Sequence, residues 1–327
     1  MASTTHATMS GSLDFIWRSS YTSRVPLTYL GRDYRALPRQ SQTWLVRPLI
    51  PVGGSAIIYG DPKVGKSYAA LQLAVALRSG TPWFGFPVVM PVDVLYIQLD
   101  TSPELWKERL DDLAEAGVNT DDIGFADRET FDTFPFNILM PDHLAMLKRA
   151  VEERHPAVVI IDTIREVHRG DENDSTDMQS VIASLVAATM PATLIIISHA
   201  RKPAAEVGAS LINDMRGSSY VVGRMDAILR FTNHTLHYTG RSVEEGKIKL
   251  KRLENGFWAP MADEVDSHIM SIIADPAFVA LSGRARARAL AQKLGKTEAA
   301  CRSLLRRYES PVHAEVVQAI APLDHQG

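Results

Sequence analysis

A glycine-rich loop in the first quarter of the chain carries the residue types that hold polyphosphates. Residues 60–67 are Gly-Asp-Pro-Lys-Val-Gly-Lys-Ser, which fits the pattern G-x-x-x-x-G-K-[ST] without a mismatch. Glycine allows successive backbone N–H groups to turn inward around phosphate oxygens. Lys66 can then reach the β- and γ-phosphates of a nucleotide, and the Ser67 hydroxyl can ligate Mg²⁺. The loop therefore predicts ATP and Mg²⁺ as cofactors, bound by Gly60, Asp61, Pro62, Lys63, Val64, Gly65, Lys66 and Ser67.

Two acidic residues follow apolar runs and can complete such a site. The run at 158–161 is followed by Asp162, and a carboxylate at the end of a strand beside the loop can hold the water shell of Mg²⁺. The run at 94–99 is followed by Asp100, which can act as the general base that orients an attacking water. Both have a structural alternative, because aspartate also forms turns and caps helices.

The elements that must position these residues follow two alternating patterns. Brief runs rich in β-branched residues predict buried parallel strands at 55–59, 92–99, 157–161 and 192–198. The stretches between and after them predict helices at 67–77, 103–116, 142–154 and 175–188. Such alternation predicts an α/β fold with a mostly parallel central sheet covered by helices. Beyond residue 227, extended pieces predict antiparallel strands that close one side of the sheet, at 228–232, 235–239 and 247–253.

The order of these motifs resembles the RecA-like P-loop ATPases and, among them, the RepA-type hexameric replicative helicases. The resemblance covers residues 42–232. It is carried by Ile-Asp-Thr-Ile-Arg-Glu-Val-His at 161–168 with Asp-Glu-Asn at 171–173, by Ser-His-Ala-Arg-Lys at 198–202, and by Arg-Gly-Ser-Ser at 216–219. It implies a RecA-like core that hydrolyses ATP within a ring of identical subunits, expected to be a hexamer.

The resemblance also implies roles for individual residues. Asp162 would be the Walker B acid, and Asp100 stands where the family usually carries a glutamate base. His199 would sense the γ-phosphate from the end of a central strand. Arg216 would reach into the neighbouring subunit's site and neutralise charge in the transition state. From the residues alone, His199 can also be a structural histidine and Arg216 a surface arginine.

Single-stranded DNA is the partner that the resemblance implies. In RecA-like rings the loops after the Walker B strand and after the sensor strand face the central channel, and here these are residues 165–174 and 201–213. The first loop is net acidic, whereas Arg201 and Lys202 on the second can contact phosphates. Both segments can also be ordinary solvated loops.

A basic segment at 284–307 precedes the end of the chain. A helix at 289–294 stopped by glycine, followed by a second helix capped at 297–298, predicts a helix-turn-helix. Arg302 and Arg306 on the second helix are the candidate DNA contacts. The alternative is a basic helical hairpin that docks on the ring or on another replication protein, such as an initiator or a primase.

Composition limits the remaining options. The 327 residues have a net charge of −3 and 46% hydrophobic residues, which is ordinary for a globular protein. The lone Cys301 forms neither an internal disulfide nor a thiolate zinc site, which favours a reducing, cytoplasmic location. No apolar run approaches the ~18 residues that span a bilayer, and the N-terminus lacks a secretory pattern, so no membrane partner is expected. His234 and His237 have no third ligand nearby and are assigned to structure.

Together these patterns predict four parts of the chain and one function. The parts are an N-terminal arm that packs on a neighbouring subunit (1–41), a RecA-like ATPase domain (42–258), a linker (259–283), and a basic helix-turn-helix-like segment with a tail (284–327). The predicted function is an ATP-dependent, ring-forming DNA helicase or translocase of plasmid or phage replication. Two alternatives stay open: a DNA-binding regulatory or accessory ATPase, and a RecA-like recombination mediator without unwinding activity.

Overall fold

The chain forms two compact units, Met1–Ser41 and Gln42–Gly327. The computed structural model describes residues 28–37, 42–132, 135–172, 174–200, 219–241, 243–261, 272, 276–294, 297–299, 301–302 and 305. The described part of the first unit holds the short helix α2 (Gly31–Ala36). The rings of Tyr29 and Tyr34 meet edge to face there, with centroids 6.2 Å apart. These contacts are local, and the role of the arm between subunits stays a prediction.

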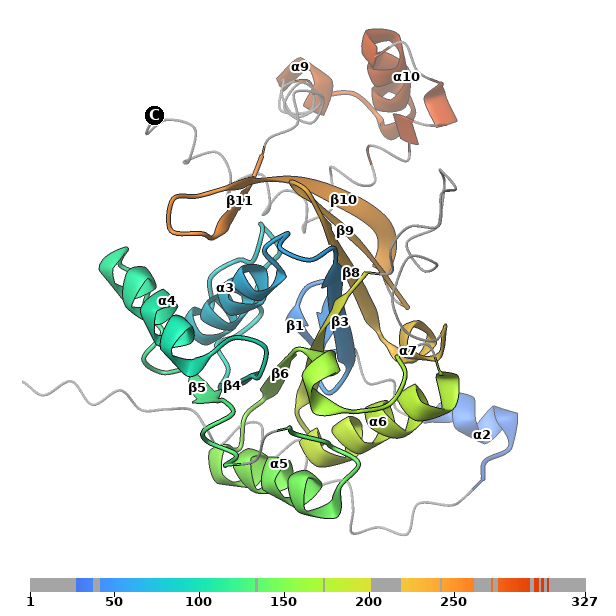
Figure 1. Ribbon diagram of the computed structural model, residues 1–327. Coiled ribbons are helices and arrows are strands. Elements are labelled where there is room, and N and C mark those ends of the chain that lie inside the picture. Colours follow the sequence, from blue (N-terminus) through green and yellow to red (C-terminus); the bar gives the residue numbers. More distant parts are fainter. Residues whose placement is uncertain are drawn as a thin grey trace, which may run out of the picture. The chain divides into compact units, whose positions relative to one another are not determined.

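A nine-stranded sheet forms the centre of the second unit (Figure 1). Its strand order is β11-β10-β9-β8-β3-β7-β6-β4-β5. The strands from β8 to β5 run parallel, and β9, β10 and β11 extend the sheet in antiparallel fashion. A separate pair, β1 (Trp44–Val46) and β2 (Ile50–Pro51), precedes the sheet. The sheet strands are β3 (Ser55–Gly60), β4 (Val94–Gln98), β5 (Gly124–Ala126), β6 (Val158–Asp162), β7 (Thr193–His199), β8 (Ala227–Thr232), β9 (Thr235–Gly240), β10 (Val243–Arg252) and β11 (Trp258–Pro260).

Helices cover both faces of the parallel strands, because those strands are apolar on both sides. Every residue of β3, β4 and β6 is buried. Successive strand residues point to opposite faces, so the core has two halves. Tyr96 and Ile160 belong to the half that includes Trp106 of α4, and Ile161 belongs to the half that includes Leu185 of α6. The helices are α3 (Lys66–Ser79), α4 (Pro103–Glu115), α5 (Pro141–Arg154), the 3-10 helix η1 (Ile164–Val167), α6 (Ser175–Thr189) and α7 (Ser219–Arg224).

This arrangement confirms the predicted RecA-like α/β fold. Each predicted strand and helix between residues 55 and 199 is present, with its ends displaced by a few residues at most. The covered parallel sheet follows from the continuous apolar runs, since strands exposed on one face would alternate apolar and polar residues. In the described part of the chain, none of the helices is both long and apolar enough to span a bilayer.

The strand after residue 227 was predicted in the wrong orientation. β8 runs parallel to β3, with Ala227 opposite Ala56, and only the following strands are antiparallel. The connection from β7 to β8, which includes α7, is long enough to return the chain to the other end of the sheet. Residue spacing alone does not give strand direction. The three-residue strand β5 was not predicted, because so short a segment carries no period.

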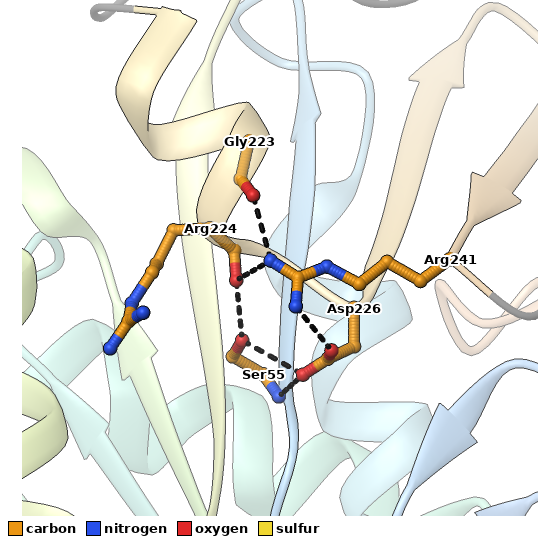
Figure 2. A network of polar contacts seen from close by, with 5 residues as sticks. All are labelled: Ser55, Gly223, Arg224, Asp226 and Arg241. Carbon is orange, nitrogen blue, oxygen red and sulfur yellow. Dashed lines mark hydrogen bonds and ion pairs between the residues drawn. The ribbon is translucent and has the colours of Figure 1, made fainter. Parts of the chain in front are cut away.

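A polar network ties the start of β3 to the start of β8 and the end of α7 (Figure 2). The Asp226 carboxylate accepts hydrogen bonds from the Ser55 backbone N–H at 2.9 Å and from the Ser55 hydroxyl at 3.2 Å. Arg241 donates to the carbonyl oxygen of Gly223 at 2.8 Å and lies 3.7 Å from Asp226 Oδ1. Because the phosphate loop follows the other end of β3, this network is structural: it anchors α7 and β8 to the central strand.

The C-terminal helical segment has a small apolar core. It contains α9 (Pro276–Val279), α10 (Gly283–Leu294) and further helical residues from Glu298 to Leu305. Arg288 Nε of α10 lies 3.2 Å from Glu298 Oε1. β11 crosses the predicted boundary at 258/259, and the boundaries of the four parts stay predictions. The core residues are Ile272, Phe278, Ala287, Leu290, Cys301 and Leu305.

Candidate functional site

The phosphate loop lies between β3 and α3, and its surroundings require two of its glycines. A Cβ at Gly60 would collide with the carbonyl oxygen of Phe231 on β8. Gly65 has a φ of +87°, in the left-handed region that favours glycine, and a Cβ there would lie 2.9 Å from Cζ2 of Trp258 on β11. Neighbouring strands therefore hold the loop from outside. Helix α3 begins at Lys66, so its positive N-terminal end faces the loop.

Lys66 is folded against the loop that carries it. Its Nζ donates to the carbonyl oxygens of Gly60 at 3.0 Å and Asp61 at 2.8 Å, and only 5% of the residue is exposed. Burial lowers the pKa of Lys66 to about 8, while nearby carboxylates act in the opposite direction. Nζ also lies 3.3 Å from Nδ1 of His199, which ends the neighbouring strand β7. The structure thus brings His199 into the site, and its role as a γ-phosphate sensor stays a prediction.

Asp162 ends β6 and is almost completely buried, with 1% of the residue exposed. Its Oδ2 accepts a hydrogen bond from the Tyr96 hydroxyl at 2.8 Å, and Ser67 also hydrogen-bonds to its side chain. Burial raises the pKa of Asp162 to about 6, against the effect of these two hydrogen bonds. Its Oδ1 is buried and has no hydrogen-bond partner among the described residues. A buried, unsatisfied carboxylate oxygen beside a serine hydroxyl suits Mg²⁺, so the residues fit the predicted metal.

Asp100 lies two residues after the end of β4 and is exposed. Its charge raises the pKa of both Lys66 and Asp162, so its carboxylate acts on the same site. Arg128 donates to the carbonyl oxygen of Asp100 at 3.1 Å, which holds the turn. The cap of α4 is Ser102, whose side chain accepts from the backbone N–H of Leu105, and not Asp100. The role of Asp100 as general base stays a prediction.

Sequence reasoning missed a group of arginines and aromatic rings beside the loop. The guanidinium carbon of Arg109 lies 4.5 Å from the ring centroid of Tyr68 and 4.9 Å from that of Trp106. Arg252 lies 5.1 Å from the same Tyr68 ring. Tyr68 directly follows Ser67, so two cations flank the residue next to the phosphate loop. These contacts join α3, α4 and β10, and no local spacing in the sequence indicates them.

The remaining predicted residues are not part of this assembly. Arg201, Lys202, Arg216 and Arg306 lie outside the described residues, and Arg302 is exposed in the C-terminal helical segment. The described part of the chain holds no group of three or more His, Cys, Asp or Glu side chains placed to bind a metal ion. The structure therefore assembles the nucleotide end of the predicted site and leaves its DNA contacts as predictions.

Residues 21–205 match an AAA domain family, AAA_25, over more than half of the chain. The chain belongs to this AAA domain family. As an AAA domain with a RecA-like sheet and a complete phosphate loop, it is a P-loop ATPase domain, of a kind that uses a nucleotide and usually Mg²⁺. The resemblance to RepA-type helicases is finer than this membership and stays a proposal.

Two curated relatives of this AAA domain bear the name DNA repair protein RadA. The protein of Bacillus subtilis (strain 168) is 24% identical over 201 residues, which are 60% of this chain and 36% of the relative. That of Halalkalibacterium halodurans is 25% identical over 236 residues, 69% of this chain and 46% of the relative. The chain thus spans less than half the length of either relative.

Two solved structures are similar to the AAA domain in fold. The KaiC-like protein PH0186 of Pyrococcus horikoshii OT3 has a TM-score of 0.45 at 13% identity, covering 66% of this chain and 93% of that one. The second is the ATPase domain of another protein, with a TM-score of 0.48 at 13% identity, covering 64% of this chain and 85% of that one. These likenesses concern the fold and not the activity.

Proposed function

We propose that this AAA domain protein is an ATP-dependent, ring-forming DNA helicase or translocase that moves on single-stranded DNA during plasmid or phage replication. One observation carries the ATPase part of this proposal: Lys66, Ser67, Asp162, Asp100 and His199 lie together at the carboxyl ends of adjacent parallel strands. The name of the RadA relatives, DNA repair protein, supports DNA as the partner. Cytoplasmic location and an initiator or primase partner belong to the same proposal.

In the proposed reaction the chain's own groups bind the nucleotide and direct water. Lys66 exchanges its two loop carbonyls for phosphate oxygens, and the loop N–H groups hold the rest of the triphosphate. Ser67 and Asp162 would hold Mg²⁺, which neutralises charge on the phosphates. Asp100 accepts the proton of the attacking water, and Arg216 of a neighbouring subunit completes the site.

The proposed DNA contacts come from the segment after β7. Arg201 and Lys202 would bind phosphates in the central channel. The loop after β6 is the weaker candidate, because Arg165 lies 3.7 Å from Glu172 and its charge is thereby offset within the loop. A second function, a DNA-binding regulatory ATPase, is favoured by the C-terminal helical segment, which has a core of its own and exposes Arg302.

Oligomer mass with and without ATP and Mg²⁺ distinguishes these functions. For the replicative ring we expect a hexamer whose ATP hydrolysis rises with single-stranded DNA of any sequence. A dimer that prefers one duplex site, and loses that preference in the double variant Arg302→Ala with Arg306→Ala, would support the regulator and contradict the ring. A filament on single-stranded DNA without strand separation would support the recombination mediator.

We expect Asp100→Asn to bind nucleotide normally and to hydrolyse it at least about 10²-fold more slowly, the usual scale of general-base loss. The amide keeps the shape of the carboxylate and removes its ability to accept a proton. Single-turnover hydrolysis and binding of a fluorescent ATP analogue separate the two effects. Asp111→Asn, an exposed carboxylate on α4, is the matched control and should match the wild type. Unchanged turnover in Asp100→Asn would exclude this residue as the base.

A further inference from the structure

Tyr96 is a polar residue in the middle of an apolar strand. It is the third residue of β4 and is completely buried. Its ring lies against Trp106 of α4 and Phe125 of β5, with centroids 5.2 and 6.1 Å away. Phenylalanine would fill the same space among these rings. The hydroxyl is therefore the feature that needs a reason, because burying it costs free energy unless it is hydrogen-bonded.

The hydroxyl contacts the two residues expected to hold Mg²⁺. It donates to Oδ2 of Asp162 at 2.8 Å and lies 3.4 Å from the carbonyl oxygen of Ser67. A phenol has one proton to donate, and the shorter contact to the carboxylate takes it. Tyr96 on β4 thus joins the last residue of β6 to the first turn of α3.

The hydrogen bond fixes which oxygen of the carboxylate remains available. Oδ2 is engaged by Tyr96, whereas Oδ1 is buried and has no hydrogen-bond partner among the described residues. The backbone also holds Asp162, since its carbonyl oxygen accepts from the N–H of Leu99 at 2.8 Å. With both the backbone and Oδ2 held, rotation of the carboxylate is restricted and Oδ1 keeps one direction.

We propose that Tyr96 is a positioning residue of the Mg²⁺ site: its hydroxyl holds Oδ2 of Asp162 and so directs Oδ1 toward the metal's water shell. The inference rests on the proposed ATPase function and adds a residue that the phosphate-loop and Walker B motifs do not include. It acts through Asp162, because the hydroxyl is already engaged and touches no nucleotide position. Groups that orient a metal ligand in this way typically contribute 10–100-fold to metal affinity or activity.

The test is Tyr96→Phe in the full-length chain, with binding of a fluorescent ATP analogue measured in EDTA and over a Mg²⁺ series. We expect the Mg²⁺ concentration for half-maximal enhancement of binding to rise about tenfold or more, and binding in EDTA to stay as in the wild type. A Mg²⁺ dependence equal to that of the wild type would overturn the inference. A loss of binding in EDTA equal to the loss in Mg²⁺ would also overturn it, since the effect would then be one of packing.

Two further variants separate positioning from folding. Phe125→Leu loosens the packing on the Tyr96 ring and keeps the hydroxyl, so it should lower the melting temperature without changing the Mg²⁺ dependence. In an Asp162→Asn background, Tyr96→Phe should add little further loss, because the residue acts through that carboxylate. Equal shifts in Phe125→Leu, or full additivity with Asp162→Asn, would contradict the inference. If the wild type itself shows no Mg²⁺-dependent nucleotide binding, the proposed ATPase function fails instead.

Discussion

Lys66→Ala should abolish ATP hydrolysis while leaving the chain folded. The side chain is the only cation that the loop itself directs inward among its described contacts, and one preorganised donor to a developing charge contributes about 10²–10³ in turnover. We therefore expect hydrolysis to fall by at least about that factor. Stability should change little, because burial lowers the pKa of Lys66, which means that its charged form is disfavoured in the folded state.

Steady-state phosphate release and thermal unfolding, measured on the same preparation, check both parts of this expectation. Lys148→Ala removes an exposed lysine from α5 and is the control for the loss of one positive charge. It should hydrolyse ATP at the wild-type rate. Activity in Lys66→Ala close to that of Lys148→Ala would show that residues 60–67 are a glycine-rich turn and not a nucleotide site.

The strands and the residues at their ends could be predicted from sequence because both signals are local. The phosphate loop is eight consecutive residues, and the strands that lead into the site are continuous apolar runs. Carboxyl ends of parallel strands meet at one edge of a sheet, so polar residues just after such runs converge there. This reasoning correctly brought Asp162 and His199 next to Lys66 and Ser67.

Contacts between distant strands could not be predicted. Tyr96 and Asp162 are 66 residues apart, and before the sheet order is known Tyr96 is one more aromatic in a core strand. Gly65 is close to Trp258 only because the chain returns through β8, β9 and β10 to the side of the phosphate loop. The same return explains the wrong orientation of β8, since strand direction depends on the whole connection and not on residue pattern.

Mixing two inactive variants should restore part of the ATPase activity if Arg216 acts across a subunit interface. Arg216→Ala subunits should still bind ATP, because their own Lys66 is intact, yet should not hydrolyse it alone. Lys66→Ala subunits lack a working site and carry an intact Arg216. In mixed rings at equal ratio, about a quarter of the interfaces would combine both intact residues. An arginine supplied in this way contributes about 10³–10⁵ in turnover, so this minority should be measurable.

The mixture has to be compared with each variant alone at the same total concentration, after native mass spectrometry has shown that mixed rings form. The double variant, Lys66→Ala with Arg216→Ala, serves as the control partner, since it offers no intact residue to a neighbour. Recovery with the single variants and none with the double variant requires Arg216 to act in trans. If mixed rings form and stay inactive, Arg216 acts within its own subunit or maintains structure, because every other component of the combined site would be present at the mixed interfaces.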